Sequence, residues 1–234
     1  MNEVIKINLE KSSLAEMVHQ QIRSDIYDLH LLPGERYTEA NLALRYKVSR
    51  TPLRLALHML KREGFLNKGN GHAAWQIPPI DLDYFQDLYE LRVNLELIAI
   101  RRICTLETPP DFSSLKNFWF VSEADRSTDG QLVANADEIF HSTLVKASGN
   151  SEMARVHSDI TERIRIIRRL DFIEGARITA AYEEHANLLR ALIKQKQELA
   201  ELLLKAHIEV SRAEIRNLTL HRLSEAANSN RQLV

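Results

Sequence analysis

Residues 33–77 read PGERYTEANLALRYKVSRTPLRLALHMLKREGFLNKGNGHAAWQI, and this stretch decides the fold of the first part of the chain. Pro33-Gly34 predicts a turn at the end of a preceding helix. Thr38 is a good N-cap for a short helix, and Ser49 for the next one. Pro52 falls in the first turn of that second helix, where a proline needs no N–H donor. Gly64 suits its C-terminal end.

The segments on either side of these two helices complete a recognisable order. Residues 14–29 carry apolar side chains at helical spacing, with Ser12 or Ser13 as the expected cap. Residues 65–68 and 74–77 are predicted as short strands joined by a hairpin tip at Gly69-Asn70-Gly71. Three helices followed by a hairpin indicate a winged helix-turn-helix. Pro78-Pro79 continues neither helix nor strand, so we expect one domain at residues 1–78 and another at 79–234.

The second half of the chain is predicted to be almost entirely helical. No segment there alternates with the period of two that strands show, and Pro, Gly and Ser clusters separate the helical patterns. The expected helices are 81–106, 111–126, 131–148, 150–172, 176–195 and 197–228. The predicted fold class is therefore mostly α, a winged helix-turn-helix followed by an all-helical bundle of about six helices.

Composition and charge narrow the class of protein. No apolar run approaches the roughly 20 residues of a membrane span, and the single cysteine, Cys104, excludes an intrachain disulfide framework. A cytoplasmic location is expected. Residues 1–80 contain 11 Lys/Arg and 8 Asp/Glu, whereas residues 81–234 contain 20 and 24. The basic excess gathers between Arg45 and Lys68, with seven basic residues and one acid, which is consistent with nucleic-acid binding.

The start of the second helix of the helix-turn-helix is where base contacts are expected. In this motif the N-terminal residues of the second helix reach base edges in the major groove. Here those residues are Ser49, Arg50, Thr51 and Arg54. Arginine can bind guanine in a bidentate pair, and Ser or Thr can reach phosphate or base. Basic residues on a helix are more often a solvated face, but the surrounding helices and hairpin favour DNA.

Several motifs of this half resemble the winged-helix domain of GntR-family transcription regulators. They are Pro33-Gly34-Glu35-Arg36, Thr38-Glu39, Leu42-Ala43, the run from Val48 to Leu57 (VSRTPLRLAL) and Leu60-x-x-Glu63-Gly64-Phe65. The resemblance implies DNA contacts from Arg36, Ser49, Arg50, Thr51 and Arg54, with Asn70 and Gly71 at the wing tip in the minor groove. Many members have an arginine where Ala40 stands, so this chain lacks that contact.

Four residues of the second half form a candidate metal site. Asp137 and His141 are four apart, so on a helix both leave the same face one turn apart. His185 and His207 lie in two later helical segments. Three imidazoles and a carboxylate suit a first-row transition metal. An Asp-x-x-x-His spacing is by itself a common accident, and the remaining six histidines are expected to be ordinary surface or core residues.

The same half resembles the FCD domain of the FadR-type branch of the GntR family. The matching motifs are Leu91-Arg92-x-x-Leu95-Glu96-x-x-Ala99, the run from Asp137 to Asn150, Glu184-His185-x-x-Leu188, and Ala200-x-x-x-Leu204-x-x-His207-Ile208. The resemblance implies a helical bundle that binds small carboxylic or sugar acids and a divalent metal. Zn, Ni and Mn all suit the ligand set. Arg92 is the candidate for binding an effector carboxylate. Its alternative role is an intrahelical ion pair with Glu96.

Three functions are compatible with these observations. The first is a repressor or activator that dimerises, binds operator DNA and responds to an effector at the metal. The second is a metal-dependent enzyme of the hydrolase type using Asp137 and the three histidines. Against it, the chain lacks a His-Glu-x-x-His motif, and Glu138 and Glu184 are sequence neighbours of ligands, which on a helix point about 100° away. The third is a purely structural metal.

Overall fold

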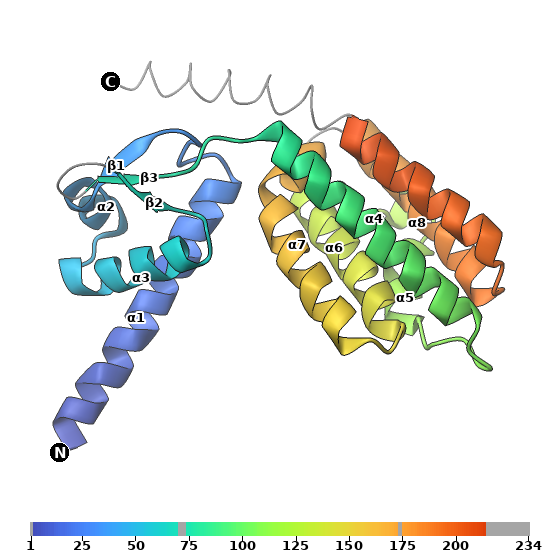
Figure 1. Ribbon diagram of the computed structural model, residues 1–234, viewed down its shortest axis with the longest axis horizontal. Coiled ribbons are helices and arrows are strands. Elements are labelled where there is room, and N and C mark those ends of the chain that lie inside the picture. Colours follow the sequence, from blue (N-terminus) through green and yellow to red (C-terminus); the bar gives the residue numbers. More distant parts are fainter. Residues whose placement is uncertain (1, 70–73, 173–174, 214–234) are drawn as a thin grey trace. The chain divides into compact units, whose positions relative to one another are not determined.

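The computed structural model describes residues 2–69, 74–172 and 175–213 (Figure 1). Their side chains are placed except for residues 2–13 and 169–171. The chain divides into two compact units, one within Met1–Asp81 and the other within Leu82–Arg222. Each unit has its own buried apolar core, so each can be considered as a separate fold.

The first unit is a winged helix-turn-helix, as the sequence predicts. Its elements are α1 (Asn2–Tyr27), β1 (Arg36–Thr38), α2 (Glu39–Tyr46), α3 (Arg50–Arg62), β2 (Asn67–Lys68) and β3 (Ala74–Gln76). Helices α1 and α2 both pack against α3. The strands form an antiparallel sheet in the order β1-β3-β2. The core of this unit includes the fully buried side chains of Ile22, Leu53, Leu57 and Leu60.

The predicted helix boundaries around the helix-turn-helix are confirmed. The Thr38 hydroxyl accepts a hydrogen bond from the Asn41 N–H at 3.1 Å and caps α2. Lys47 takes a left-handed conformation with φ of 54°, which ends α2 and turns the chain into α3. Gly64 has φ of 86° just past the end of α3, a conformation that glycine adopts without strain.

One local prediction in the first unit is wrong, and the structure has one strand more than the sequence predicts. The first helix begins at Asn2, so Ser12 and Ser13 lie inside it and do not cap it. The preceding residues contain no Pro or Gly to stop the helix. Strand β1 was not expected, because three residues are too few to show an alternating pattern. It forms by pairing with β3, where Tyr37 lies opposite the buried Trp75.

The second unit is a helical bundle (Figure 1). Its elements are α4 (Leu82–Cys104), α5 (Ser113–Trp119), a 3₁₀ turn (Glu123–Asp125), α6 (Gly130–Ala147), α7 (Ser151–Asp171), α8 (Gly175–Ile193) and a helix over residues 197–213. Helix α4 packs against α6, α7 and α8, and α6 packs against α7 and α8. Within these described residues, no helix is both long and apolar enough to cross a bilayer.

The expected helix at residues 111–126 is wrong, because α5 stops at Trp119. The Trp119 side chain is buried against the bundle. The chain resumes as a 3₁₀ turn, where the Ser122 hydroxyl donates to Asp125 at 2.6 Å. Side-chain hydrogen bonds of this kind offer the backbone an alternative to helix. The predicted helix to residue 228 is described only as far as residue 213, and its remainder lies outside the described residues.

Candidate metal centre and DNA-reading surface

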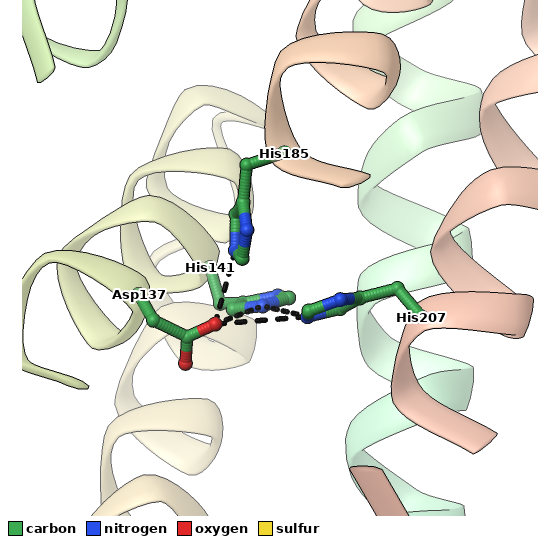
Figure 2. Close-up of side chains that lie close together, drawn as sticks. All are labelled: Asp137, His141, His185 and His207. Carbon is green, nitrogen blue, oxygen red and sulfur yellow. Dashed lines mark hydrogen bonds and ion pairs between the residues drawn. The ribbon is translucent and has the colours of Figure 1, made fainter. Parts of the chain in front are cut away.

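The bundle brings the four predicted metal ligands together (Figure 2). Asp137 and His141 extend from one face of α6, His185 comes from α8, and His207 from the 197–213 helix. All four side chains are buried, and one potential ligand atom from each lies within 4.8 Å of the others. Asp137 Oδ1 is 3.0 Å from His185 Nε2, 3.5 Å from His141 Nε2 and 3.6 Å from His207 Nε2.

Each imidazole is oriented by an acceptor at its other ring nitrogen. That nitrogen is Nδ1 in every case. His141 Nδ1 lies 2.5 Å from Glu96 Oε2, and His207 Nδ1 lies 2.6 Å from Glu184 Oε2. His185 Nδ1 lies 2.7 Å from the Ala181 carbonyl oxygen. A neutral imidazole that donates from Nδ1 carries its lone pair on Nε2. All three lone pairs are therefore available toward the Asp137 carboxylate, which is the arrangement that metal-binding histidines use.

The contacts at the centre fit a bound cation better than hydrogen bonds between the side chains. His141 Nε2 and His207 Nε2 are 3.1 Å apart, although both are acceptors when their Nδ1 atoms donate. Buried His185 Nε2 has no hydrogen-bond partner among the described residues, and its neighbour Asp137 Oδ1 is also an acceptor. Ligands on one ion at about 2.1 Å would be roughly 3.0–3.4 Å apart. The residues thus fit a divalent transition metal.

Two arginines complete the surroundings of the ligands. Arg168 on α7 pairs with Asp137 Oδ2, so that Oδ1 faces the histidines. Arg177 on α8 donates to Glu184 at 2.9 Å and so holds the carboxylate that orients His207. Arg168 reaches Asp137 from a different helix, whereas Arg177 and Glu184 lie seven residues apart on the same helix, α8.

The expectations for Glu184 and His157 need correction. Glu184 does not point away from the site, because His207 arrives from a different helix and donates to it. His157 on α7 is not an unremarkable core histidine, since its Nε2 donates to Glu96 Oε1 at 2.9 Å. Glu184 contacts the predicted ligand His207 directly. His157 contacts Glu96, which is the hydrogen-bond partner of the predicted ligand His141. In contrast, Glu138 pairs with Arg165, away from the four ligands.

The ionisation states around the centre favour metal binding. Burial lowers the pKa of all three histidines, well below the usual value for His185 and to about 4 for His207. Burial would raise the pKa of Glu96, but His141 and the Arg92 guanidinium lower it well below the usual value. Neutral imidazoles beside an ionised carboxylate are the forms that bind a divalent cation.

An aromatic wall closes one side of the centre. Trp119 stacks on His185 with ring centroids 4.0 Å apart and an interplanar angle of 11°. Phe140 meets the same imidazole edge-on at 4.4 Å. These apolar rings shield His185 from water and fix its plane. The Trp119 indole Nε1 is buried without a hydrogen-bond partner among the described residues.

Arg92 forms an ion pair with Glu96, and part of its guanidinium has no hydrogen-bond partner among the described residues. Its Nε donates to Glu96 Oε1 at 2.8 Å within α4, which is the expected intrahelical pair. Its Nη2 is nevertheless buried and has no hydrogen-bond partner among the described residues. The Thr161 hydroxyl on α7 is in the same situation. Unsatisfied buried donors are costly, so Arg92 has a remaining N–H suited to an anionic group.

In the first unit, the residues expected to read DNA lie at the start of α3. Arg50 and Thr51 are exposed in its first turn, and Ser49 precedes them without a side-chain capping bond. Arg54 is 57% exposed and donates to Glu39 Oε2 at 2.7 Å. Arg36 is exposed on β1. Asn70 and Gly71, the expected wing tip, lie outside the described residues.

Comparison with known proteins identifies the family. The bacterial regulatory protein gntR family matches residues 14–74, and the FCD domain matches residues 87–210. The chain belongs to the GntR family, with an FCD domain. The Nta operon transcriptional regulator of Aminobacter aminovorans is 34% identical over 180 residues, covering 77% of this chain and 84% of the relative. An L-lactate dehydrogenase operon regulatory protein of Escherichia coli is 25% identical, covering 83% of each.

Solved structures agree with this fold. A GntR transcriptional regulator from Rhodococcus sp. RHA1 superimposes with a TM-score of 0.69 at 19% identity, covering 88% of this chain and 99% of that one. At this identity the likeness concerns the fold alone. The family matches and the named relatives make the chain a DNA-binding transcriptional regulator and not an enzyme. The hydrolase alternative for the Asp137 site is therefore wrong.

Proposed function

We propose that this GntR-family regulator binds operator DNA through residues 1–78 and releases or engages it in response to a small carboxylate bound in residues 79–234. A divalent metal held by Asp137, His141, His185 and His207 forms one side of the effector site. The observation that carries the proposal is the convergence of three buried Nε2 lone pairs on one carboxylate oxygen. We assign the site to a sensing pocket in the cytoplasm, with Zn, Ni or Mn as the candidate metals.

The proposed DNA contacts follow from the exposure and chemistry of the first turn of α3. Arg50 and Arg54 are the residues for base edges, because an arginine can pair bidentately with guanine. Ser49 and Thr51 are suited to phosphate, together with the α3 backbone amides. Arg36 on β1 and the wing tip at Asn70 and Gly71 would add contacts outside the major groove.

The effector class follows from the unsatisfied donors around the bundle core. Arg92 Nη2 is a cationic donor that favours a carboxylate. Trp119 Nε1 and Thr161 Oγ1 are further buried donors without partners among the described residues, and suit hydroxyl or carboxylate oxygens. The relative named for an L-lactate dehydrogenase operon is consistent with a hydroxy acid or a sugar acid.

The proposal includes a homodimer formed through the helical domain. Leu91 and Ile98 on α4 are exposed, as are Leu199 and Leu202 on the 197–213 helix. The ion pair of Arg101 with Glu201, 2.8 Å, joins these two helices. Adjacent exposed apolar side chains are typical of a contact with another protein surface. A dimer would present two recognition helices to half-sites about 10 base pairs apart.

A DNA-binding titration tests the proposal. The labelled DNA upstream of the protein's own gene would be titrated by fluorescence anisotropy at several salt concentrations, against a scrambled duplex of equal length. We expect sequence-selective binding that weakens as salt rises, because phosphate contacts release counterions. Equal affinity for both duplexes would refute the assignment of an operator in this region.

The sensing role is tested by substituting one ligand. A thermal-shift screen of small carboxylates and sugar acids, with and without Zn²⁺, should find compounds that stabilise the protein only when metal is present. His185→Ala should abolish this stabilisation and the effector's influence on DNA binding, while DNA binding itself is retained. Global unfolding of His185→Ala would instead favour a purely structural metal.

A further inference from the structure

Glu96 has an unusual position among the residues around the metal centre. It is a fully buried carboxylate on α4 that accepts hydrogen bonds from three cationic or potentially cationic side chains. His141 Nδ1 lies 2.5 Å from Oε2, whereas Arg92 Nε at 2.8 Å and His157 Nε2 at 2.9 Å both lie on Oε1. One oxygen therefore serves a metal ligand and the other serves the candidate effector-binding arginine.

The side chains that donate to the two oxygens share the single negative charge of the Glu96 carboxylate. A carboxylate that accepts from Nδ1 makes the opposite imidazole nitrogen a stronger metal ligand. A guanidinium on the other oxygen withdraws part of that charge from the oxygen that serves His141. An anion bound to Arg92 would offset its positive charge, leaving more of the Glu96 charge for His141.

We propose that Glu96 is a positioning residue that couples the occupancy of Arg92 to the affinity of the metal site. Neutralising Arg92 with an anionic effector strengthens the hydrogen bond from His141 to Glu96 and tightens metal binding. By thermodynamic linkage, the bound metal tightens effector binding by the same factor. This inference rests on the proposed function, since it uses the same metal and the same arginine.

His157 explains how Glu96 can keep its position while Arg92 changes partner. It donates to Oε1 from α7, whereas Arg92 approaches the same oxygen from within α4. If the guanidinium turns toward an effector, Oε1 still has a donor, so the carboxylate is not left unsatisfied. Oε2 then remains on His141. The network therefore accommodates both states without a buried unpaired carboxylate.

Zinc affinity of the full chain tests the coupling without knowledge of the effector. Metal-free protein would compete with a chromophoric chelator for Zn²⁺, and circular dichroism would confirm that each variant is folded. Glu96→Gln should weaken Zn²⁺ binding about 10- to 100-fold, the usual effect of losing such an outer partner. Arg92→Gln should tighten it by about 5-fold or more. Arg101→Gln, which removes an exposed guanidinium on the same helix, should leave it unchanged.

The double variant shows whether the effect passes through Glu96. Glu96→Gln and Arg92→Gln/Glu96→Gln should bind Zn²⁺ equally, because Arg92 has no charged partner left to influence. The double variant removes both charges of the pair, so it supplies a folded comparison even if Arg92→Gln alone is unstable. Tighter binding by the double variant than by Glu96→Gln, or unchanged binding by Glu96→Gln, would overturn the coupling. Absence of Zn²⁺ binding by the unsubstituted protein would instead refute the proposed metal site itself.

Discussion

Acidification should destabilise the metal-free bundle through its buried histidines. The pKa of His207 is lowered from 6.5 to about 4 by burial, so between these pH values the unfolded chain binds more protons than the folded one. Stability is then fully present above pH 6.5 and falls as the pH decreases. Each pKa unit corresponds to about 1.4 kcal/mol, so His207 alone contributes about 3 kcal/mol across this interval. His141 and His185 act in the same direction.

The measurement is urea denaturation in EDTA at pH steps from 7.5 to 4.5, followed by tryptophan fluorescence. Trp75→Phe leaves Trp119, which stacks on His185, as the only tryptophan. The free energy of unfolding should fall with pH, and His207→Gln should make that fall shallower by up to about 1.4 kcal/mol per pH unit. The carboxylates of buried Glu96 and half-buried Glu184 have lowered pKa values, so the stability that they contribute is lost only below about pH 4.5.

Two outcomes would refute this reasoning. A free energy of unfolding that stays constant between pH 6.5 and 5 would mean that the imidazoles are not buried in the neutral form. An identical slope for His207→Gln and the parent protein would mean that His207 does not take part. Added Zn²⁺ should raise the stability at pH 7.5 and lose its effect on acidification, because protonated imidazoles do not bind metal.

Three further predictions concern other parts of the molecule. Gly130→Ala should lower the free energy of unfolding by roughly 1–3 kcal/mol, because its Cβ would clash with the Phe172 carbonyl oxygen; Gly175→Ala meets no neighbour and should have little effect in the same urea titration. Arg50→Ala should weaken operator binding by about 1–3 kcal/mol and relax preference at one base, measured by anisotropy on single-base variants. Leu202→Glu should halve the mass in sedimentation equilibrium, whereas Leu44→Glu, which changes an even more exposed leucine in the first unit, should not.

Local signals in the sequence determined the winged helix-turn-helix. Thr38 as a cap and Gly64 as a stop act through the backbone of their own neighbours, so their effect is encoded within a few residues. The spacing of Asp137 and His141 likewise predicts a shared helix face, which the structure confirms. His185 and His207 are predicted as ligands from their residue type in later helical segments and from the resemblance to FCD domains, because no local pattern connects them to α6.

Only the tertiary structure decided what surrounds these ligands. Glu96, Glu184 and Arg168 belong to helices distant in sequence from the groups that they orient, and their spacing along the chain carries no sign of the contact. The stop of α5 at Trp119 likewise depends on where a large ring finds burial. Sequence periodicity specifies which face of a helix is buried, whereas packing of several helices specifies which side chains meet there. The sequence therefore predicted the four ligands, and the packing of the helices determined which charged side chains contact them.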